Sequence, residues 1–245
     1  MMKIHTFFCL MSLLCLPFGL SQANPSSAQG GIKLPQTRVI FQAKDKNATA
    51  TIQNRGDNVY LVKASIQISP ENSENRVPFA VTPPLFRLEP QNQQIVKIVR
   101  KNNQQLPTDR ESVFYLSFLA IPSTLNEKVT PMRVSIGLQT IIKLFYRPDL
   151  LPMTQELAAS QLKFSLREQL LVITNPTPYY LTLGMLKIAD KNIILNSTEQ
   201  MIAPFSQSHY PYPGKGSTAY WQVINDYGGM SPIHQAPIEH AQGPS

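Results

Sequence analysis

The chain has 245 residues, and its 22 lysines and arginines outnumber its 15 aspartates and glutamates, which gives a formal net charge of +7. The basic residues are scattered, without the basic stripe and interleaved aromatic side chains typical of nucleic-acid binding, so nucleic acid is excluded as a partner. Both cysteines, Cys9 and Cys15, lie close to the N-terminus. The rest of the chain must therefore be stable without a disulfide.

The first 23 residues have the pattern of a secretory signal peptide. Lys3 gives a charged start, residues 6–20 are mostly apolar, and Ser21-Gln22-Ala23 is a small-x-small cleavage site. The apolar run is short for a membrane span, and Pro17 breaks its end. Cleavage after Ala23 removes both cysteines and leaves roughly 220 residues, enough for one large or two modest domains. We predict an exported protein without membrane insertion.

Short apolar runs separated by turn residues recur along the first half of the chain. Together with the abundance of proline, at 21 residues, and the scarcity of helix-period patterns, they indicate an all-β protein. Strands are expected at residues 37–41, 48–54, 59–68, 94–100 and 112–121. Pro83, Pro84 and Pro90 forbid a central strand around them and indicate a bend between strands.

The last expected strand of this half lies between Arg133 and Pro148 and is the most informative stretch of the chain. Alternate positions in its first part are apolar, namely Val134, Ile136 and Leu138. This period of two is typical of a strand with one apolar face. The second part holds two isolated cations, Lys143 and Arg147, and the strand has no acidic residue. Such a strand is either a core strand or an edge that pairs with another chain, and the pattern alone leaves both open.

A domain boundary is predicted at residues 148–152. Prolines bracket this segment, and Pro148 disfavours a helical conformation of Arg147. The β pattern then restarts, with strands expected at residues 162–166, 170–175, 179–188, 192–195 and 217–225. The prediction is thus two β-sandwich domains, residues 24–147 and 153–235. Residues 236–245 are the last part of a polar C-terminal stretch, and we expect them to form a flexible tail.

The sequence contains no motif that indicates catalysis or metal binding. His209, His234 and His240 lack the spacing of metal ligands, and there is no nucleophile elbow or phosphate-binding glycine loop. The acidic residues are few and separated, and nothing indicates the paired carboxylates of a glycosidase. We therefore expect no enzyme activity, no metal site and no cofactor.

Seven segments together resemble the periplasmic chaperones of chaperone–usher pilus assembly. They are residues 37–41, 78–90, 106–116, 136–148, 172–179, 203–205 and 224–228. They occur in the family's order and with normal spacing over nearly all of the chain beyond the signal peptide, whereas any one alone would be a weak signal. The resemblance implies two immunoglobulin-like β-sandwiches arranged as an L with a cleft between them.

The mechanism that the resemblance implies is donor-strand complementation. Pilus subunits are sandwiches that lack their last strand, and the chaperone lends the last strand of its first domain to fill the open groove. The inserting apolar positions correspond to Val134, Ile136 and Leu138. The preceding loop is short and no cysteine pair flanks it, as in the short-loop branch of the family. The Pro/His/Gln-rich stretch from Ser231 departs from the family pattern.

Five charged residues also match family positions with known roles. Arg38 and Lys143 match two cleft cations that hold the C-terminal carboxylate of the subunit, which needs paired charge and donors once it is buried. Glu111, Arg147 and Asp226 match a salt-bridge cluster between the domains, in which one arginine bridges two carboxylates and fixes the domain orientation.

The expected partners are pilus subunits and an outer-membrane usher, and the expected location is the periplasm. An exposed apolar edge also favours self-association. When no client is bound, we therefore expect that two copies can cover each other's donor strand in a self-capping homodimer. The alternative is a secreted two-domain immunoglobulin-like binding or adhesin protein, which would leave Arg38 and Lys143 without a role. A pilus subunit is rejected, because subunits are usually one incomplete domain.

Overall fold

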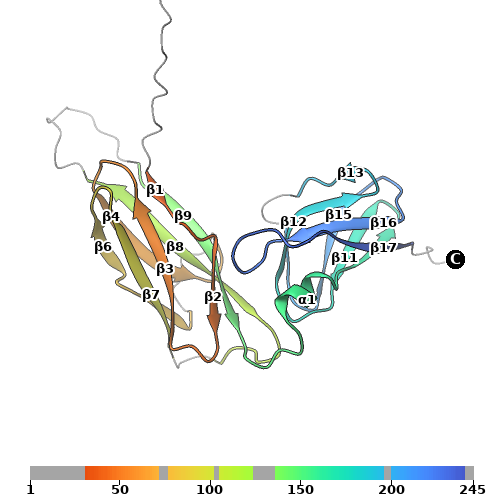
Figure 1. The fold of residues 1–245 in the computed structure, drawn as a ribbon, viewed down its shortest axis with the longest axis horizontal. Coiled ribbons are helices and arrows are strands. Elements are labelled where there is room, and N and C mark those ends of the chain that lie inside the picture. Colours follow the sequence, from red (N-terminus) through yellow and green to blue (C-terminus); the bar gives the residue numbers. More distant parts are fainter. Residues whose placement is uncertain (1–30, 72–76, 102–104, 124–135, 196–199, 241–245) are drawn as a thin grey trace, which may run out of the picture.

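The computed structural model of the chain consists almost entirely of β-strands, which form two lobes set at an angle to each other (Figure 1). The structure describes residues 31–71, 77–101, 105–123, 136–195 and 200–240, and the predicted signal peptide lies outside these ranges. The expected all-β fold with two sandwich-like domains arranged as an L is confirmed.

The first lobe is a sandwich of a four-stranded and a five-stranded sheet, with strand orders β1-β3-β7-β5 and β2-β9-β8-β4-β6. The strands are β1 Ile32–Lys33, β2 Arg38–Gln42, β3 Asn47–Asn54, β4 Tyr60–Gln67, β5 Phe79–Thr82, β6 Leu85–Leu88, β7 Gln93–Arg100, β8 Ser112–Pro122 and β9 Leu138–Arg147. The chain changes sheet between β1 and β2. As a result β2 lies parallel to β9, while β1 pairs with β3.

Alternation of apolar and polar residues determines which face of each strand is buried. In β4 the side chains of Val62, Ala64 and Ile66 face the core, whereas Leu61 and Lys63 are exposed. The strand β8 is apolar on both faces, and it occupies a central place between β9 and β4. Strand β8 therefore supports β9 along one edge.

The strands of the second lobe join into one curled sheet around a second core. The strand order is β13-β12-β16-β17-β10-β11-β15, and β14 pairs with β12. The elements are α1 Gln155–Ala159, β10 Lys163–Arg167, β11 Leu170–Asn175, β12 Leu181–Ile188, β13 Lys191–Asn192, β14 Met201–Ile202, β15 Ser206–Pro211, β16 Thr218–Val223 and β17 His234–His240. The fully buried Trp221 lies 4.7 Å from Phe164 between ring centroids, and its Nε1 donates to the carbonyl of Ala159 in α1.

The prediction of a flexible tail from residue 236 is wrong for its first part. Strand β17 pairs antiparallel with β16 and parallel with β10, and this pairing joins the two layers of the second lobe. Ile238 is buried in the core, while Glu239 is exposed. The polar composition concealed the strand, because Ile238 is the one large aliphatic side chain on its inner face. Residues 241–245 lie outside the described residues.

Candidate functional site: an open strand edge and a cationic cleft

Strand β9 is paired along both edges over its second half only. It pairs with β8 from Leu138 to Tyr146, but with β2 only from Lys143 to Arg147. Among the described strands, residues 138–142 thus have a partner on one edge, and the backbone N–H and C=O groups of the other edge are available. An open edge of this kind is a template for the addition of a strand from another chain.

The inner face of β9 passes from the core to the surface along the strand. Ile142 and Leu144 are buried in the core of the first lobe, whereas Leu138 is 50% exposed and Ile136, just before the strand, is 78% exposed. All four share one face by alternation. Val134, the third predicted inserting residue, lies outside the described residues. Apolar side chains therefore accompany the open edge.

The two predicted anchor cations lie next to each other between the lobes. Arg38 and Lys143 are register partners on β2 and β9. Both reach the second lobe, where Arg38 Nη1 donates to the carbonyl of Ile224 at 3.0 Å and Lys143 Nζ donates to Thr182 Oγ1 at 3.4 Å. Lys143 also lines a hollow of about 540 Å³ that Met201 borders from the second lobe. Both cations thus lie where the two lobes meet, and we call this part of the junction, with Arg38, Lys143 and the hollow beside Lys143, the cationic cleft.

The electrostatics of this pair favour an anion. Burial, and then the neighbouring Arg38, lower the pKa of Lys143 to about 8. Burial also lowers the pKa of Arg38, with Asp226 and Glu111 acting in the opposite direction. The Nε of Arg38 is buried and has no hydrogen-bond partner. A carboxylate in this cleft would compensate the charge of both side chains and offer acceptors to their free donors.

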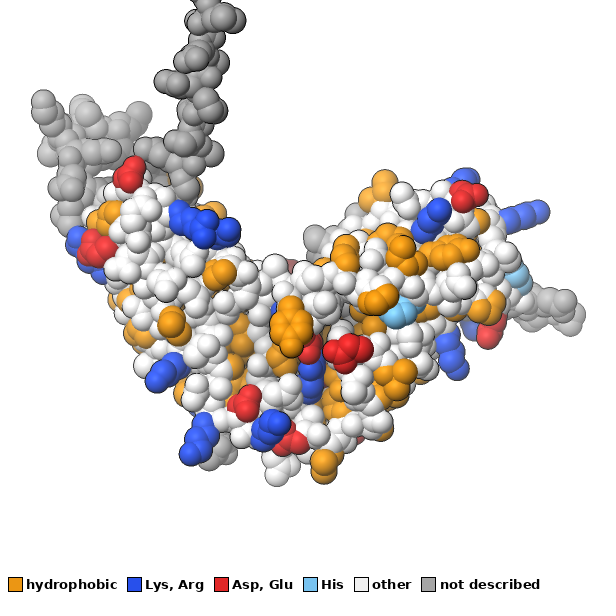
Figure 2. Space-filling model, viewed as in Figure 1, with side chains coloured by type: hydrophobic (Ala, Val, Ile, Leu, Met, Phe, Trp, Pro, Cys, Tyr) orange, Lys and Arg blue, Asp and Glu red, His pale blue; other side chains and the backbone are white. Residues whose placement is uncertain are grey.

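The other three predicted site residues are also brought together. Arg147 Nε donates to Glu111 Oε1 at 2.8 Å, and its Nη1 and Nη2 donate to the two carboxylate oxygens of Asp226 at 2.6 and 2.8 Å. Glu111 and Arg147 belong to the first lobe and Asp226 to the second. Figure 2 shows acidic and basic side chains in contact where the lobes meet. Burial raises the pKa of Glu111, while Arg147 acts to lower it.

Several contacts of this junction were not predicted from the sequence. Besides Thr182 and the carbonyl of Ile224, the backbone N–H of Tyr180 donates to Glu111 Oε2 at 2.9 Å, and Arg147 lies over the ring of Tyr179, with 5.0 Å from its Cζ to the centroid. Nearly every residue type has the same backbone donor and acceptor, so contacts made by backbone groups cannot be recognised from the sequence. Thr182 could have been noticed as the polar residue between Leu181 and Leu183 at the start of an apolar run.

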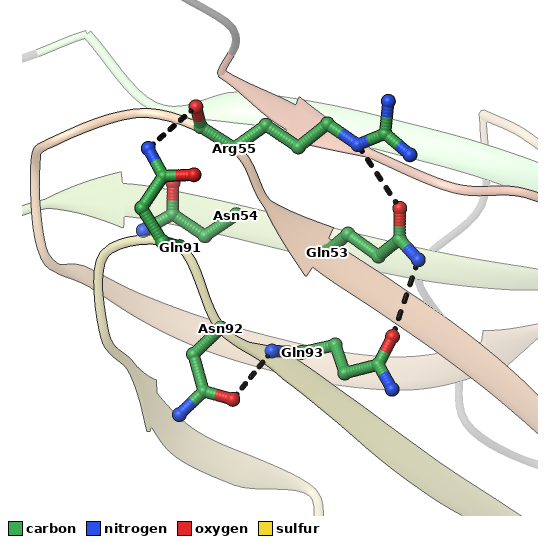
Figure 3. A pocket seen from close by; sticks show the side chains of 6 residues that line it. All are labelled: Gln53, Asn54, Arg55, Gln91, Asn92 and Gln93. Atoms are coloured by element: carbon green, nitrogen blue, oxygen red, sulfur yellow. Dashed lines mark hydrogen bonds between the residues drawn. The ribbon is translucent and has the colours of Figure 1, made fainter.

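A second hollow lies where β3 ends and β7 begins (Figure 3). Its lining is polar and consists of Gln53, Asn54, Arg55, Gln91, Asn92 and Gln93. These side chains bond to one another: Gln53 Nε2 donates to Gln93 Oε1 at 3.2 Å, and Arg55 Nε donates to Gln53 Oε1 at 3.3 Å. Because the amides satisfy each other, this hollow has less capacity for a ligand than the cationic cleft.

Two further findings concern the described residues alone. They contain no group of three or more His, Cys, Asp or Glu side chains that could hold a metal ion. None of their helices has the length and apolar character needed to cross a membrane.

The fold and the cleft define a class of two-domain β-sandwich proteins with an open edge strand beside paired cations. Residues 31–152 match the family described as "Pili and flagellar-assembly chaperone, PapD N-terminal domain", and residues 157–235 match "Pili assembly chaperone PapD, C-terminal domain". The chain therefore belongs to the PapD family of pilus-assembly chaperones, which confirms the family predicted from its ordered segments. Chaperones are in general not enzymes.

Individual relatives agree with this family. The chain is 33% identical over 227 residues to the chaperone protein FimC of Escherichia coli, with 92% of this chain and 91% of FimC covered. It is 34% identical over 239 residues to the probable fimbrial chaperone YadV of the same species, with 91% and 96% covered. A solved structure of the Salmonella enterica SafA pilin in complex with the SafB chaperone matches with a TM-score of 0.75 and 32% identity, covering 84% of this chain and 96% of that chain.

Proposed function

We propose that the protein is a periplasmic chaperone that binds pilus subunits by donor-strand complementation and delivers them to an outer-membrane usher. The signal peptide directs its export, and the protein acts by binding, without catalysis or a cofactor. The observation that carries this proposal is the open edge of β9 over residues 138–142, flanked by exposed apolar side chains. The pilin complex of the related SafB supports a pilin as client.

The exposed side chains of this strand supply the driving force for binding. Insertion of Ile136 and Leu138, and of Val134 before them, buries each in the open groove of the subunit. Full burial of one such side chain contributes about 1.5–3 kcal/mol, from which the costs of ordering and association are subtracted. Main-chain hydrogen bonds to the open edge of β9 hold the two strands in register.

The cations of the cleft fix that register. Arg38 and Lys143 bind the C-terminal carboxylate of the subunit at one end of the open edge. Lys143 lies five positions after Leu138, which corresponds to roughly 17 Å along a strand. The carboxylate therefore determines which subunit residue lies beside Leu138, and a one-residue slip would turn its side chains to the wrong face.

The proposal is tested by co-expression with a pilin subunit and measurement of the amount of intact subunit in the periplasm. Leu138→Asp places a charge on the inserting face but leaves folding intact, because Leu138 is half exposed. We expect this variant to lose subunit protection. Ile95→Asp, at a similarly exposed position of β7 in the other sheet, is the matched control and keeps it. Equal protection by both variants would overturn the proposal.

A further inference from the structure

The second lobe supplies one acceptor to each cation of the cleft. The hydroxyl of Thr182 accepts from Lys143, and the carbonyl of Ile224 accepts from Arg38. The two residues that carry these acceptors are also joined through their backbones, since the N–H of Ile224 donates to the carbonyl of Thr182 at 2.8 Å. A hydrogen-bonded pair in the second lobe thus faces the register pair of cations in the first lobe.

Both acceptors are uncharged, and this matters for what the cleft can bind. Adjacent cations repel each other, and burial adds to the cost of their charge. Neither Arg38 nor Lys143 forms an ion pair with another described residue. Neutral acceptors hold the two side chains in place without cancelling their charge. Asp226 and Glu111 act on Arg38 from the neighbouring ion cluster but are paired with Arg147, so a carboxylate ligand displaces no acid that is ion-paired with either cation.

We propose that Thr182 is a positioning residue of the carboxylate anchor, whose hydroxyl holds the ammonium group of Lys143 beside Arg38. This inference rests on the proposed function and assigns part of the client site to the second lobe. Thr182 is 2% exposed and lies at the second position of β12, so its hydroxyl has a fixed place. The equivalent acceptor for Arg38 is a backbone carbonyl, which no substitution removes. Thr182 is thus the member of the pair that can be tested.

The test uses the full chain and a synthetic probe, the peptide acetyl-Thr-Val-Thr-Val with either a free C-terminal carboxyl or a C-terminal amide. Thr182→Val removes the hydroxyl and keeps the shape of the side chain, while Thr182→Ser keeps the hydroxyl. We expect Thr182→Val to weaken binding of the acid peptide about three- to tenfold, the range for the loss of one ordinary hydrogen bond. Thr182→Ser restores it, and the weaker binding of the amide peptide is the same in all variants.

A second readout separates positioning from a general loss of structure. An acceptor stabilises the protonated ammonium group, so Thr182→Val lowers the pKa of Lys143 below its wild-type value in an NMR titration of its side chain. Thr174→Val, the same change on β11 away from the cleft, moves neither the titration nor the binding. Wild-type binding and titration of Thr182→Val would overturn the inference.

One more variant distinguishes this inference from the function on which it rests. If Lys143→Met loses the acid peptide while Thr182→Val binds it normally, only the role of Thr182 fails. If Lys143→Met also binds the acid peptide as tightly as the wild type does, the carboxylate anchor itself fails, and the role of Thr182 fails with it.

Discussion

Arg147 and Asp226 are joined by two hydrogen bonds, of 2.6 and 2.8 Å, although they belong to different lobes and are 79 residues apart in the chain. The remaining nitrogen of the guanidinium binds the buried Glu111 of the first lobe. Asp226 lies two residues after Ile224, whose carbonyl accepts from Arg38. The ion cluster and the cationic cleft therefore share one segment of the second lobe, in which Ile224 and Asp226 contact two arginines of the first lobe.

Asp226→Asn tests the contribution of this cluster to stability. The substitution keeps the shape of the side chain but leaves Arg147 with one carboxylate. Loss of one partner of a fully buried ion pair costs about 3–5 kcal/mol. The side chain of Asp226 is 27% exposed, so we expect the free energy of unfolding to fall by a smaller amount, about 1–3 kcal/mol. Urea denaturation at pH 7 measures it.

The matched control for this prediction is Asp109→Asn. Asp109 forms an exposed pair with its neighbour Arg110, and such pairs contribute little to stability. We expect the control to leave the urea midpoint unchanged. An equal effect of Asp109→Asn and Asp226→Asn would show that the cluster does not stabilise the junction of the lobes.

Local patterns were sufficient to predict most strands. The alternation in β4 and the double apolar face of β8 correspond directly to one-sided and two-sided burial. The short helix α1 was not predicted, because five residues are too few to show a helical period, and its N-cap Thr154 was the remaining signal. Strand β17 was missed because pairing on both edges, which residue type does not reveal, holds its polar sequence in place.

The site could be predicted only in part. Arg38 and Lys143 are 105 residues apart, and their contact depends on the parallel pairing of β2 with β9, which no local pattern encodes. They were identified through the resemblance to a family and not from spacing. Thr182 was missed because its contribution is a single hydroxyl whose partner lies in the other domain. Interactions between domains are thus the part that sequence patterns specify least.

An asparagine closes a turn in the same way in both lobes. Asn54 ends β3, accepts from the N–H of Gly56 and donates to the carbonyl of Asn58. Asn175 ends β11, accepts from the N–H of Thr177 and donates to the carbonyls of Tyr179, Ile202 and Ala203. This repeat is not visible in the residue types, because only the asparagine itself is common to both turns.

Asn175→Ala tests this arrangement in the second lobe. Asn175 is fully buried, and its removal leaves backbone groups without partners. Because each unsatisfied buried group costs about 1–3 kcal/mol, we expect the free energy of unfolding of the second lobe to fall by about 2–4 kcal/mol in urea denaturation. Asn192→Ala, at an exposed position of β13, is the control and stays within about 0.5 kcal/mol of the wild type. A similarly small effect of Asn175→Ala would contradict the prediction.

Ile238→Ala tests whether β17 is an integral strand of the second lobe. Ile238 is 6% exposed and pairs with Phe164 of β10. Truncation of a buried isoleucine costs about 2–5 kcal/mol, and we expect a loss in this range by thermal or urea denaturation. Glu239→Gln, on the exposed face of the same strand, changes stability little. If the two variants were equally stable, the strand would behave as the flexible tail that its composition suggested.

The pKa of Lys143, lowered to about 8 by burial and by Arg38, predicts a gain of stability with pH in the client-free protein. An unfolded lysine has a pKa near 10.4. Between about pH 8 and pH 10 the unfolded chain therefore binds more protons at this residue than the folded chain does, and this residue's contribution to the free energy of unfolding rises with pH. Lys143→Met removes this contribution, which the difference between the two pH–stability profiles measures.

The proposed carboxylate anchor predicts the opposite pH dependence for client binding. A carboxylate beside Lys143 stabilises its charged form and raises its pKa, so binding requires the proton that the free protein loses above about pH 8. We expect the Kd for a peptide with a free C-terminal carboxyl to be constant between pH 6 and pH 7 and to rise by up to about tenfold per pH unit above 8. Isothermal titration calorimetry measures this profile. In Lys143→Arg the cation keeps its charge over the whole range, and the rise disappears. A wild-type Kd that is the same at pH 7 and pH 9.5 would mean that the ammonium group of Lys143 does not contact the carboxylate.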